Sequence, residues 1–570
     1  MGIDVTVKVG GEAGQGIQTV GDLLARVCHG CGLYVLAVND FESRIRAGHS
    51  FLQLRISDRP VAAPDHRVHL LVALSPGTLD MHLSELAEEG LAIFDSQEQA
   101  PGGNVVSIAV TDMARKAGGT IMANTVAAGA CLSLLGAPDS LLENVLKTQF
   151  QAKKSGVLEN NLKAAQSGVQ AVGGIDFAPA FVWPEKKPIG KLLSGAKILA
   201  LGALAADCRF AAFYPMSPAT DIMASLTGFE DRAPLVVEQA EDEIAAVNMV
   251  IGASFAGVRA MTATSGGGFA LMTEGLGLAG ITETPIVIVN SQRPGPATGL
   301  PTRTAQADLR FVLHAAQDEF PRFVFAPTNL NDGFETMGRA FALADKYQVP
   351  AIVLTDQYFN DSVNIAQKNL TAPESVERHI VTDADMDDPK AYRRYEITDS
   401  GISPRALPCA GQALVMVSGN EHQQDGHISE TIPDRIGQVD KRFRKLAAME
   451  GEIRPPQTEH PDSRVLLVGW GSAAGAINES VEMLRSEGMD AGGVYFTDIW
   501  PFPQQAAEQI LGRCDRFYMV EQNVSAQLGG LIREKTGLKF YQAVLKYDGR
   551  PFFPFEIARR VKAAEEAIDG

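Results

Sequence analysis

One stretch, residues 234–310, places the tightest limit on how the chain can fold. It contains three short apolar segments that end in glycine, hydroxyl or charged residues, and these are 235–237, 258–264 and 286–290. After the first of them, Ile244, Val247 and Ile251 recur at the spacing of an amphipathic helix. Strands that alternate with helices in this way form a parallel sheet, whose ligands gather at the carboxyl ends of the strands. We therefore expect an α/β fold with its functional site in this stretch.

The same strand, turn and helix pattern returns on both sides of this stretch. With 570 residues, the chain is too long for one hydrophobic core. We expect a doubly wound α/β domain, a linker, the domain with the stretch above, an extended arm and a last α/β domain, at residues 1–180, 181–194, 195–360, 361–461 and 462–570. The arm is expected because roughly a hundred polar, irregular residues are untypical of a compact core. One short helix is expected in it, at 438–449.

The charge balance and the apolar runs exclude several classes of protein. A formal net charge of −18 leaves no basic stripe that would neutralise nucleic acid. No apolar run reaches the roughly 18 residues of a membrane span, and the N-terminus enters a strand without a signal peptide. Six scattered cysteines make no disulfide framework. We expect a cytoplasmic protein that binds neither nucleic acid nor membranes.

A glycine loop (GGEAGQG, residues 10–16) follows the first expected strand. Gly11, Gly14 and Gly16 would let backbone N–H groups approach a phosphate at the start of the next helix. The spacing departs from GxGxxG and no Walker lysine follows, so a tight turn without a ligand explains the loop equally well. Together with the arginines and histidine of the nearby loop 41–50, it would suit an anionic cofactor such as CoA.

Cys28 and Cys31 form a lone CxxC at the end of an expected helix. A zinc site or an iron–sulfur cluster needs four ligands, and the other four cysteines are scattered. We therefore expect no metal site and no iron–sulfur cluster in this chain.

The segment YPMSP, residues 214–218, leads from an expected strand into a helix. Ser217 as N-cap with Pro218 in the first turn explains it without any ligand. The same geometry aims the Ser217 hydroxyl and free backbone N–H groups at an anion. Both interpretations stay open.

Glu243 begins the next helix, directly after Glu241 and Asp242. A carboxylate is favoured there by the helix dipole, so capping alone explains its position. Its apolar neighbours also suit a desolvated carboxylate that shuttles protons. The loops TATSGGG (262–268) and RPGPATGLPTRT (293–304) add hydroxyl groups, N–H groups and arginines, and two such loops beside one acidic helix start are less easily dismissed as turns.

These segments together resemble the α subunit of the 2-oxoacid:ferredoxin oxidoreductases, most closely the 2-oxoglutarate type, 2-oxoglutarate synthase. YPMSP is similar to the family's YPITP, and VEQAEDEIAAVNMVIGASFAG, MTATSGGGFALM and RPGPATGLPTRTAQADL follow in the family's order. The GGEAGQG domain resembles the family's γ subunit fused ahead of α. The resemblance covers essentially the whole chain. It implies a γ-type doubly wound domain, a thiamine pyrimidine-binding domain and a transketolase C-terminal-like domain.

The resemblance also implies a reaction and a set of partners. 2-Oxoglutarate, CoA and two oxidised ferredoxins would give succinyl-CoA, CO₂ and two reduced ferredoxins, reversibly. A β subunit, in an α₂β₂ assembly, would bind the diphosphate of thiamine diphosphate, Mg²⁺ and a [4Fe–4S] cluster. The lack of a GDG element with its asparagine pair in this chain agrees with that division of the site.

Individual residues take their roles from the same resemblance. Glu243 matches the glutamate that faces N1′ of the aminopyrimidine, where it takes part in acid–base catalysis through the cofactor, with Glu241 as a second choice. Arg303 matches the arginine that receives the 2-oxoacid carboxylate, and Ser217 stands where the family has threonine. The other expected substrate-site residues are Tyr214 and Pro215. The expected cofactor-site residues are Thr262, Thr264, Ser265, Gly266, Gly11, Gly14 and Gly16.

Two departures from the family pattern bear on this match. SGGG replaces the more usual SGPG at 265–268, which should loosen that turn, and GAKI replaces the family's GNEA at 195–198. Pyruvate or another 2-oxoacid remains an alternative substrate. For 2-oxoglutarate, either Arg293 or a basic residue of the β subunit would bind the second carboxylate. A non-catalytic nucleotide-binding scaffold and a transketolase-like carboligase without an electron carrier also remain as alternatives.

Overall fold

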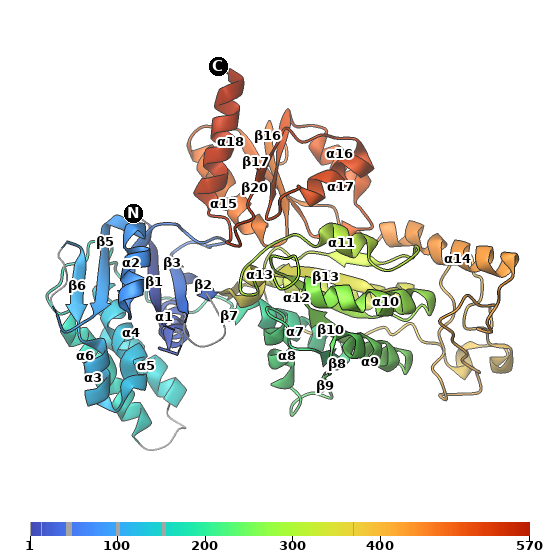
Figure 1. The fold of residues 1–570 in the computed structure, drawn as a ribbon, viewed down its shortest axis with the longest axis horizontal. Coiled ribbons are helices and arrows are strands. Elements are labelled where there is room, and N and C mark those ends of the chain that lie inside the picture. The colour runs from blue at the N-terminus through green and yellow to red at the C-terminus, as the bar shows by residue number, and fades with distance from the viewer. Residues whose placement is uncertain are drawn as a thin grey trace. The chain divides into compact units, whose positions relative to one another are not determined.

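The computed structural model describes residues 2–569 apart from 13, 42–47, 99–102, 151–155 and 369. Its chain divides into two compact units (Figure 1). The first unit consists of Met1–Ser194, Asp361–Asn369 and Phe552–Pro554, and the second holds the rest of the chain.

The first unit is built on a mixed sheet with the strand order β6-β5-β4-β1-β3-β2-β14-β7. Its strands are β1 Asp4–Glu12, β2 Tyr34–Phe41, β3 His49–Ser57, β4 Val68–Ala73, β5 Leu86–Asp95, β6 Val105–Ile108, β7 Lys191–Ser194 and β14 Val363–Ala366. Its helices are α1 Ile17–Gly30, α2 Pro76–His82, α3 Val110–Ala117, α4 Ala123–Leu134, α5 Asp139–Phe150 and α6 Val157–Ala171, with short 3-10 turns at Leu83–Glu85 and Thr120–Met122. The central strand β1 runs antiparallel to β3 and parallel to β4.

The second unit contains two sheets. The first has the order β18-β12-β13-β11-β10-β8-β9 and the second the order β15-β17-β16-β19-β20. Their strands are β8 Cys208–Phe213, β9 Val236–Gln239, β10 Arg259–Thr264, β11 Val287–Gln292, β12 Phe323–Phe325, β13 Ala351–Asp356, β15 Gln457–Glu459, β16 Val465–Trp470, β17 Ala491–Phe496, β18 Asp498–Trp500, β19 Arg516–Glu521 and β20 Gln542–Leu545.

Helices accompany both sheets of the second unit, and one long helix belongs to the expected arm. They are α7 Gly195–Ala205, α8 Thr220–Thr227, α9 Glu243–Phe255, α10 Gly266–Ile281, α11 Leu309–His314, α12 Leu330–Tyr347, α13 Gln357–Asp361, α14 Ile432–Glu450, α15 Ala473–Ser486, α16 Gln504–Leu511, α17 Gln527–Thr536 and α18 Pro554–Asp569, with 3-10 turns at Asp383–Asp385 and Pro389–Ala391. Together with the first unit, this confirms the multidomain α/β fold class.

Parallel pairing sets the functional edge of the larger sheet in this unit. Strands β10, β11 and β13 are buried along their whole length and pair in parallel, so their carboxyl ends lie side by side. Buried, β-branched and apolar strands of this kind are typical of parallel sheets covered on both faces. The polar residues that follow each strand therefore come together at one edge, as the strand and helix pattern predicts.

The two sheets of the second unit share one hydrophobic core. The C-terminal strand β18 pairs with β12, antiparallel, and so completes the larger sheet. Buried residues of both sheets pack into the same apolar cluster, with Ile288 and Ile352 on one side and Val468 and Phe496 on the other. The regions expected at 195–360 and 462–570 thus form one compact unit, and β18 of the second region belongs to the sheet of the first.

Three elements differ from the elements that the sequence predicts. Strand β7 lies in the expected linker and strand β14 at the start of the expected arm, where they pair with each other. Such a pairing joins segments about 170 residues apart, which local patterns do not reveal. Helix α14 begins at Ile432 and not at 438. Its first turn has Pro433, and the Thr431 side chain accepts a hydrogen bond from Asp434 N.

Within the described parts of the chain, no single helix is long and apolar enough to cross a membrane. The bent pair formed by Val110–Ala117 and Thr120–Leu134 has the length and composition of a broken span. Most of α4, the helical part of the second segment, is buried in the core of the first unit.

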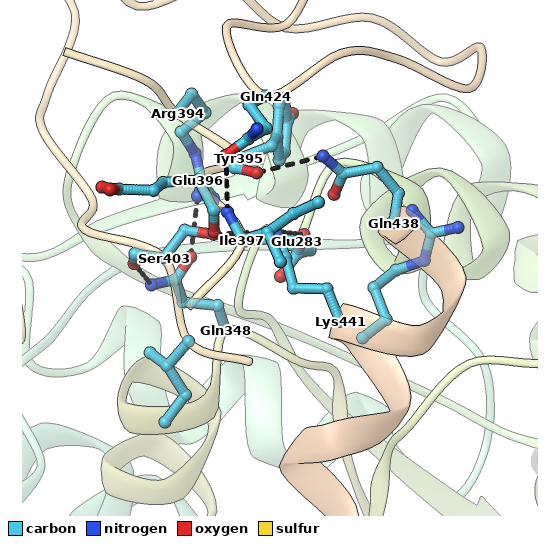
Figure 2. Close-up of polar contacts among 12 residues, drawn as sticks. Glu283, Gln348, Arg394, Tyr395, Glu396, Ile397, Ser403, Gln424, Gln438 and Lys441 are labelled. Carbon is cyan, nitrogen blue, oxygen red and sulfur yellow. Dashed lines mark hydrogen bonds and ion pairs between the residues drawn. The ribbon is translucent and has the colours of Figure 1, made fainter. Parts of the chain in front are cut away.

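The arm is attached to the larger sheet domain through buried ions. Glu283, at the end of α10, accepts hydrogen bonds from Lys441 Nζ (2.6 Å) and Lys445 Nζ (2.5 Å), both on α14. All three side chains are almost completely buried. Figure 2 shows Arg394, Tyr395, Gln348 and Ser403 around Glu283 and Lys441. Although burial opposes it, the two ammonium groups hold the pKa of Glu283 well below its usual range. The segment expected as an extended arm is therefore anchored by an ion cluster.

A second buried cluster attaches the arm at another point. Asp345 on α12 accepts hydrogen bonds from Arg259 of β10 (2.8 Å) and from Arg378 (3.2 Å) and Arg405 (3.4 Å) of the arm. Arg405 also donates to the Ser254 carbonyl group. These charge-assisted contacts fix irregular backbone that has few helices or strands of its own.

We expect Glu283→Gln to release the arm, because the change leaves two buried ammonium groups with one neutral partner. Breaking a buried ion cluster in this way costs roughly 3–5 kcal/mol. Hydrogen exchange followed by mass spectrometry should show faster exchange over residues 370–450. The control is Glu143→Gln, which breaks an exposed pair with Lys147 on α5 and should change local stability by less than about 1 kcal/mol. Unchanged exchange in the Glu283 variant would mean that the cluster does not hold the arm.

Candidate functional site

The candidate site begins with Glu243 in the first turn of α9. The preceding Asp242 caps this helix, because its side chain accepts a hydrogen bond from Ala245 N (2.7 Å). Capping therefore falls to Asp242, and Glu243 is free for another role. Its side chain is 2% exposed, and its Oε1 has no hydrogen-bond partner among the described residues. A buried carboxylate oxygen without a partner is costly and calls for a ligand or a proton to explain it.

Helix α10 closes tightly over this carboxylate. A Cβ atom added at Gly268 would collide with Thr264 Oγ1 and lie 2.7 Å from Glu243 Oε1. Glu243 and Thr264 are therefore neighbours across the start of α10. The adjacent Gly267 has no atom closer than 4.0 Å to an added Cβ, so the close approach is specific to the second of these glycines.

Hydroxyl groups line the end of β10 next to Glu243. Thr262, Thr264 and Ser265 are completely buried. Over the part of the chain that the structure describes, Thr262 Oγ1 and Ser265 Oγ have no hydrogen-bond partner, whereas Thr264 Oγ1 lies 3.8 Å from Met216 Sδ. Since buried polar groups are nearly always paired, such a cluster of unpaired atoms fits a site built for a polar ligand.

The loop after β8 contributes the predicted substrate residues. Tyr214 and Pro215 are exposed, and Ser217 is half-buried. Ser217 does not cap the next helix: α8 begins at Thr220 and its cap residue, Ala219, has no side-chain cap bond. This finding removes the interpretation of Ser217 as an N-cap.

Two arginines lie on the loop after β11. Arg293 Nη1 donates a hydrogen bond to the Ser217 carbonyl group (2.8 Å), and burial lowers the pKa of Arg293. Arg303 is half-buried further along the loop, where a Cβ added at Gly549 would lie 3.0 Å from Arg303 Cβ. The structure thus brings Glu243 and Thr264 together and ties the loop of Ser217 to Arg293, while Arg303 lies beside the loop that follows β20.

A buried polar seam between the two sheets of this unit was not predicted. Asp356, at the end of β13, accepts hydrogen bonds from Ser472 Oγ (2.5 Å) and Phe359 N (2.8 Å). Gln522 Nε2 donates to the same Ser472 oxygen (3.3 Å). Polar residues at the ends of three apolar strands were the available signal, because the carboxyl ends of such strands collect functional groups.

The glycine loop of the first unit forms a turn that its own residues close. Gly14 and Gly16 have positive φ values of 96° and 77°, which favour glycine. Gln15 N donates to Glu12 O, and Gln15 Oε1 accepts from Glu12 N (2.7 Å) and occupies the space that a Cβ at Gly11 would need. A tight turn accounts for these contacts without a ligand. The expected arginine loop at 42–47 lies outside the described residues.

Cys28 and Cys31 are both buried, and burial raises the pKa of the Cys28 thiol far above its usual range. A thiol held in this state is a poor metal ligand. Across the described ranges, no group of three or more His, Cys, Asp or Glu side chains is arranged to hold a metal ion.

The buried polar seam at Asp356 leads to a prediction about how stability depends on pH. Burial raises the pKa of Asp356 from 3.8 to about 6. The stability it contributes is therefore fully present below pH 3.8 and is lost as the pH rises through about 6, by roughly 3 kcal/mol. Thermal unfolding of wild type and Asp356→Asn between pH 4 and pH 8 should show the wild type losing stability relative to the variant across that window. A constant difference between the two would contradict a buried, titrating Asp356.

Comparison with known proteins covers the chain from end to end. Three family models match: pyruvate ferredoxin/flavodoxin oxidoreductase at residues 6–171, the thiamine diphosphate-binding model of pyruvate flavodoxin/ferredoxin oxidoreductase at 201–441, and pyruvate:ferredoxin oxidoreductase core domain II at 463–554.

Similar proteins are known from archaea and bacteria. The 2-oxoacid:ferredoxin oxidoreductase subunit alpha of Saccharolobus solfataricus is 31% identical over 98% of this chain and 97% of its own length. The 2-oxoglutarate synthase subunit KorA of Methanothermobacter thermautotrophicus is 30% identical over 65% of this chain and 97% of its own length. The structure of 2-oxoglutarate:ferredoxin oxidoreductase from Magnetococcus marinus, with 2-oxoglutarate, coenzyme A and succinyl-CoA bound, aligns with a TM-score of 0.91 at 29% identity and covers 98% of this chain and 99% of its own. The chain therefore belongs to the 2-oxoacid:ferredoxin oxidoreductase family, as its α subunit.

Proposed function

We propose that this α subunit, with a β subunit, converts 2-oxoglutarate and CoA to succinyl-CoA and CO₂. Two electrons pass to two oxidised ferredoxins and one proton is released, so atoms and charge balance. The observation that carries the proposal is the buried Glu243 carboxylate, whose Oε1 is unpaired in the described part of the chain beside a glycine-rich helix start. Similarity to a structure that holds 2-oxoglutarate, coenzyme A and succinyl-CoA supports the choice of substrate.

The unpaired polar atoms fit the pyrimidine half of thiamine diphosphate. When bound, this cofactor supplies a carbon nucleophile that can also stabilise a carbanion. Glu243 would hold and return a proton at the pyrimidine N1′ atom, because a desolvated carboxylate suits proton transfer. The residues that would line the cofactor around it are Thr262, Thr264, Ser265 and Gly266.

The substrate groups follow from the loops at the same sheet edge. Arg303 would bind the 2-oxoacid carboxylate, since its planar guanidinium group offers two parallel N–H donors. Ser217, Tyr214 and Pro215 would lie against the rest of the substrate. On the separate sheet of the first unit, the backbone N–H groups of Gly11, Gly14 and Gly16 would approach the phosphate groups of CoA, although the turn itself is closed by Gln15.

The partner subunit completes this proposal. The β subunit would bind the diphosphate through Mg²⁺ and carry the [4Fe–4S] cluster that passes electrons to ferredoxin, in an α₂β₂ assembly. The working compartment would be the cytoplasm: Cys409 is an exposed free thiol, which suits a reducing environment.

We expect Glu243→Gln to lower activity about 10²-fold or more in the complex with the β subunit, because general acid–base catalysis contributes at least that much. The assay is CoA-dependent reduction of a viologen dye with 2-oxoglutarate. The matched control is Glu241→Gln, two residues earlier and exposed, which should retain activity within about twofold.

Three results would each correct a different part of the assignment. Loss of activity in the Glu241 variant alone would show that the register is wrong. Full activity in both variants would place the chemistry elsewhere and favour a scaffold role for this chain. Activity with pyruvate alone would leave the mechanism in place and change the substrate.

A steric change next to Glu243 gives an independent prediction. Gly268→Ala places a methyl group against Thr264 Oγ1 and Glu243 Oε1, so it should displace the carboxylate and lower kcat at least tenfold, since a 1 Å misplacement alone can cost 10²-fold. Gly267→Ala, one position earlier, meets only Ala297 O, at 4.0 Å, and should leave kcat unchanged while stabilising the helix by about 0.5–1 kcal/mol. Equal effects of the two changes on kcat would contradict a site at Glu243.

A further inference from the structure

Asn290, at the end of β11, has an unpaired acceptor next to the proposed cofactor site. It is completely buried and pairs in register with Thr264 on the neighbouring strand. Thr264 in turn is a neighbour of Glu243 beside Gly268. Asn290 Nδ2 donates a hydrogen bond to Asp308 Oδ2 (3.1 Å), whereas Oδ1 has no partner among the residues that the structure describes. One half of this amide is therefore satisfied and the other half is not.

Asp308 decides which half of the amide is left unpaired. Its backbone N–H donates to Gln292 Oε1 (2.9 Å), which fixes the residue at the start of α11. A Cβ added at Gly266 would collide with Asp308 Oδ2, so the carboxyl group lies directly against the start of α10. An ionised carboxylate accepts hydrogen bonds and donates none. Burial raises the pKa of Asp308, but the hydrogen bond from Asn290 Nδ2 opposes that rise and favours the carboxylate. The Asn290 NH₂ group is thus turned toward Asp308, which leaves Oδ1 as an acceptor.

The chemistry of the bound groups identifies a matching donor. An unpaired buried acceptor is destabilising, and a ligand N–H or O–H group at this position would offset that cost. The carbonyl and carboxylate groups of 2-oxoglutarate are acceptors only. The aminopyrimidine ring of thiamine carries an amino group, which is a donor, on the ring carbon opposite N1′. Asn290 lies on β11, next to the strand β10 that carries Thr264. With Glu243 at N1′, the donor that faces Asn290 would be this amino group.

We propose that Asn290 Oδ1 accepts a hydrogen bond from the pyrimidine amino group of thiamine diphosphate, and that Asp308 is a positioning residue that holds the Asn290 amide in this orientation. The inference rests on the proposed function, because it assumes that thiamine diphosphate binds at Glu243. It adds Asn290 of β11 as a cofactor-binding residue. It also explains why the Asp308 carboxyl group lies against the start of α10.

The test compares two cofactors that differ at this one group. Oxythiamine diphosphate has a carbonyl oxygen in place of the amino group and so offers Asn290 Oδ1 no donor there. Affinities for both compounds are measured by calorimetry with the cofactor-depleted complex of this chain and its β subunit. Wild type should bind thiamine diphosphate more tightly. Asn290→Ala should weaken thiamine diphosphate binding about tenfold, or about 1.4 kcal/mol, and leave oxythiamine diphosphate binding unchanged.

Variants of the positioning residue give a result that damage to the fold would not. In Asp308→Asn the amide of Asn290 can turn and offer NH₂ to the carbonyl oxygen, so binding of oxythiamine diphosphate should improve while thiamine diphosphate binding weakens. The exchange N290D/D308N keeps one carboxylate, one amide and their hydrogen bond, and it returns an acceptor to position 290. Its preference for thiamine diphosphate should return to within about threefold of wild type, a residual of at most ~0.7 kcal/mol.

The possible failures are distinguishable. If Asn290→Ala weakens both compounds equally, or neither, Asn290 does not meet the amino group and this inference is wrong while the proposed function stands. If Asp308→Asn lowers both affinities and the exchange restores neither, Asp308 has only a structural role. If the wild-type complex binds no thiamine diphosphate at all, the proposed function fails, and this inference fails with it.

Discussion

The loop of residues 302–308 depends on the Gln306 side chain, whose amide NH₂ group and amide oxygen both form hydrogen bonds to residues at the strand ends of the second sheet. Gln306 Nε2 donates to the Trp470 carbonyl group (2.7 Å), and Gln306 Oε1 accepts from Gln522 N (3.2 Å). Its backbone N–H also donates to Gln522 O (2.9 Å). The loop that carries Arg303 is thus held by strands β16 and β19, although it follows β11 of the other sheet. The position of Arg303, the proposed substrate arginine, therefore depends on both sheets.

Buried charge is the main means by which irregular backbone is held in this protein. The arm has few helices and strands, yet Glu283 and Asp345 each receive several cationic groups from it. Such clusters add little net stability over well-packed apolar residues, but removing one of the charged partners is strongly destabilising. They therefore specify where the arm lies more than they strengthen the fold, which is the use of buried ions that best fits a segment without a core of its own.

Much of the fold and part of the site could be predicted from local sequence. The strand and helix periods place β10, α10 and β11 well, because each is a continuous buried element bounded by polar or glycine residues. Glu243 could be singled out for its place at a helix start. The resemblance to a known family supplied the roles that local patterns leave open.

The rest could not be predicted, because it depends on contacts between distant segments. The pairing of β7 with β14 and the Asp356–Ser472 hydrogen bond join residues more than 100 positions apart, and no local period records them. The orientation of the Asn290 amide depends on one carboxylate 18 positions later. Capping could explain Glu243 from the sequence alone, whereas the structure gives the N-cap of α9 to Asp242.

Strand β18 has a consequence for how the chain can be divided. It comes from the C-terminal region yet pairs with β12, which would otherwise be the edge strand and whose Val324 and Phe325 are fully buried. A protein cut before residue 462 would present β12 as an apolar strand with free N–H and C=O groups, the kind of edge on which other chains assemble. The C-terminal region therefore protects its neighbour from aggregation as well as completing it. Any shortened version of this subunit would need another segment to pair with β12.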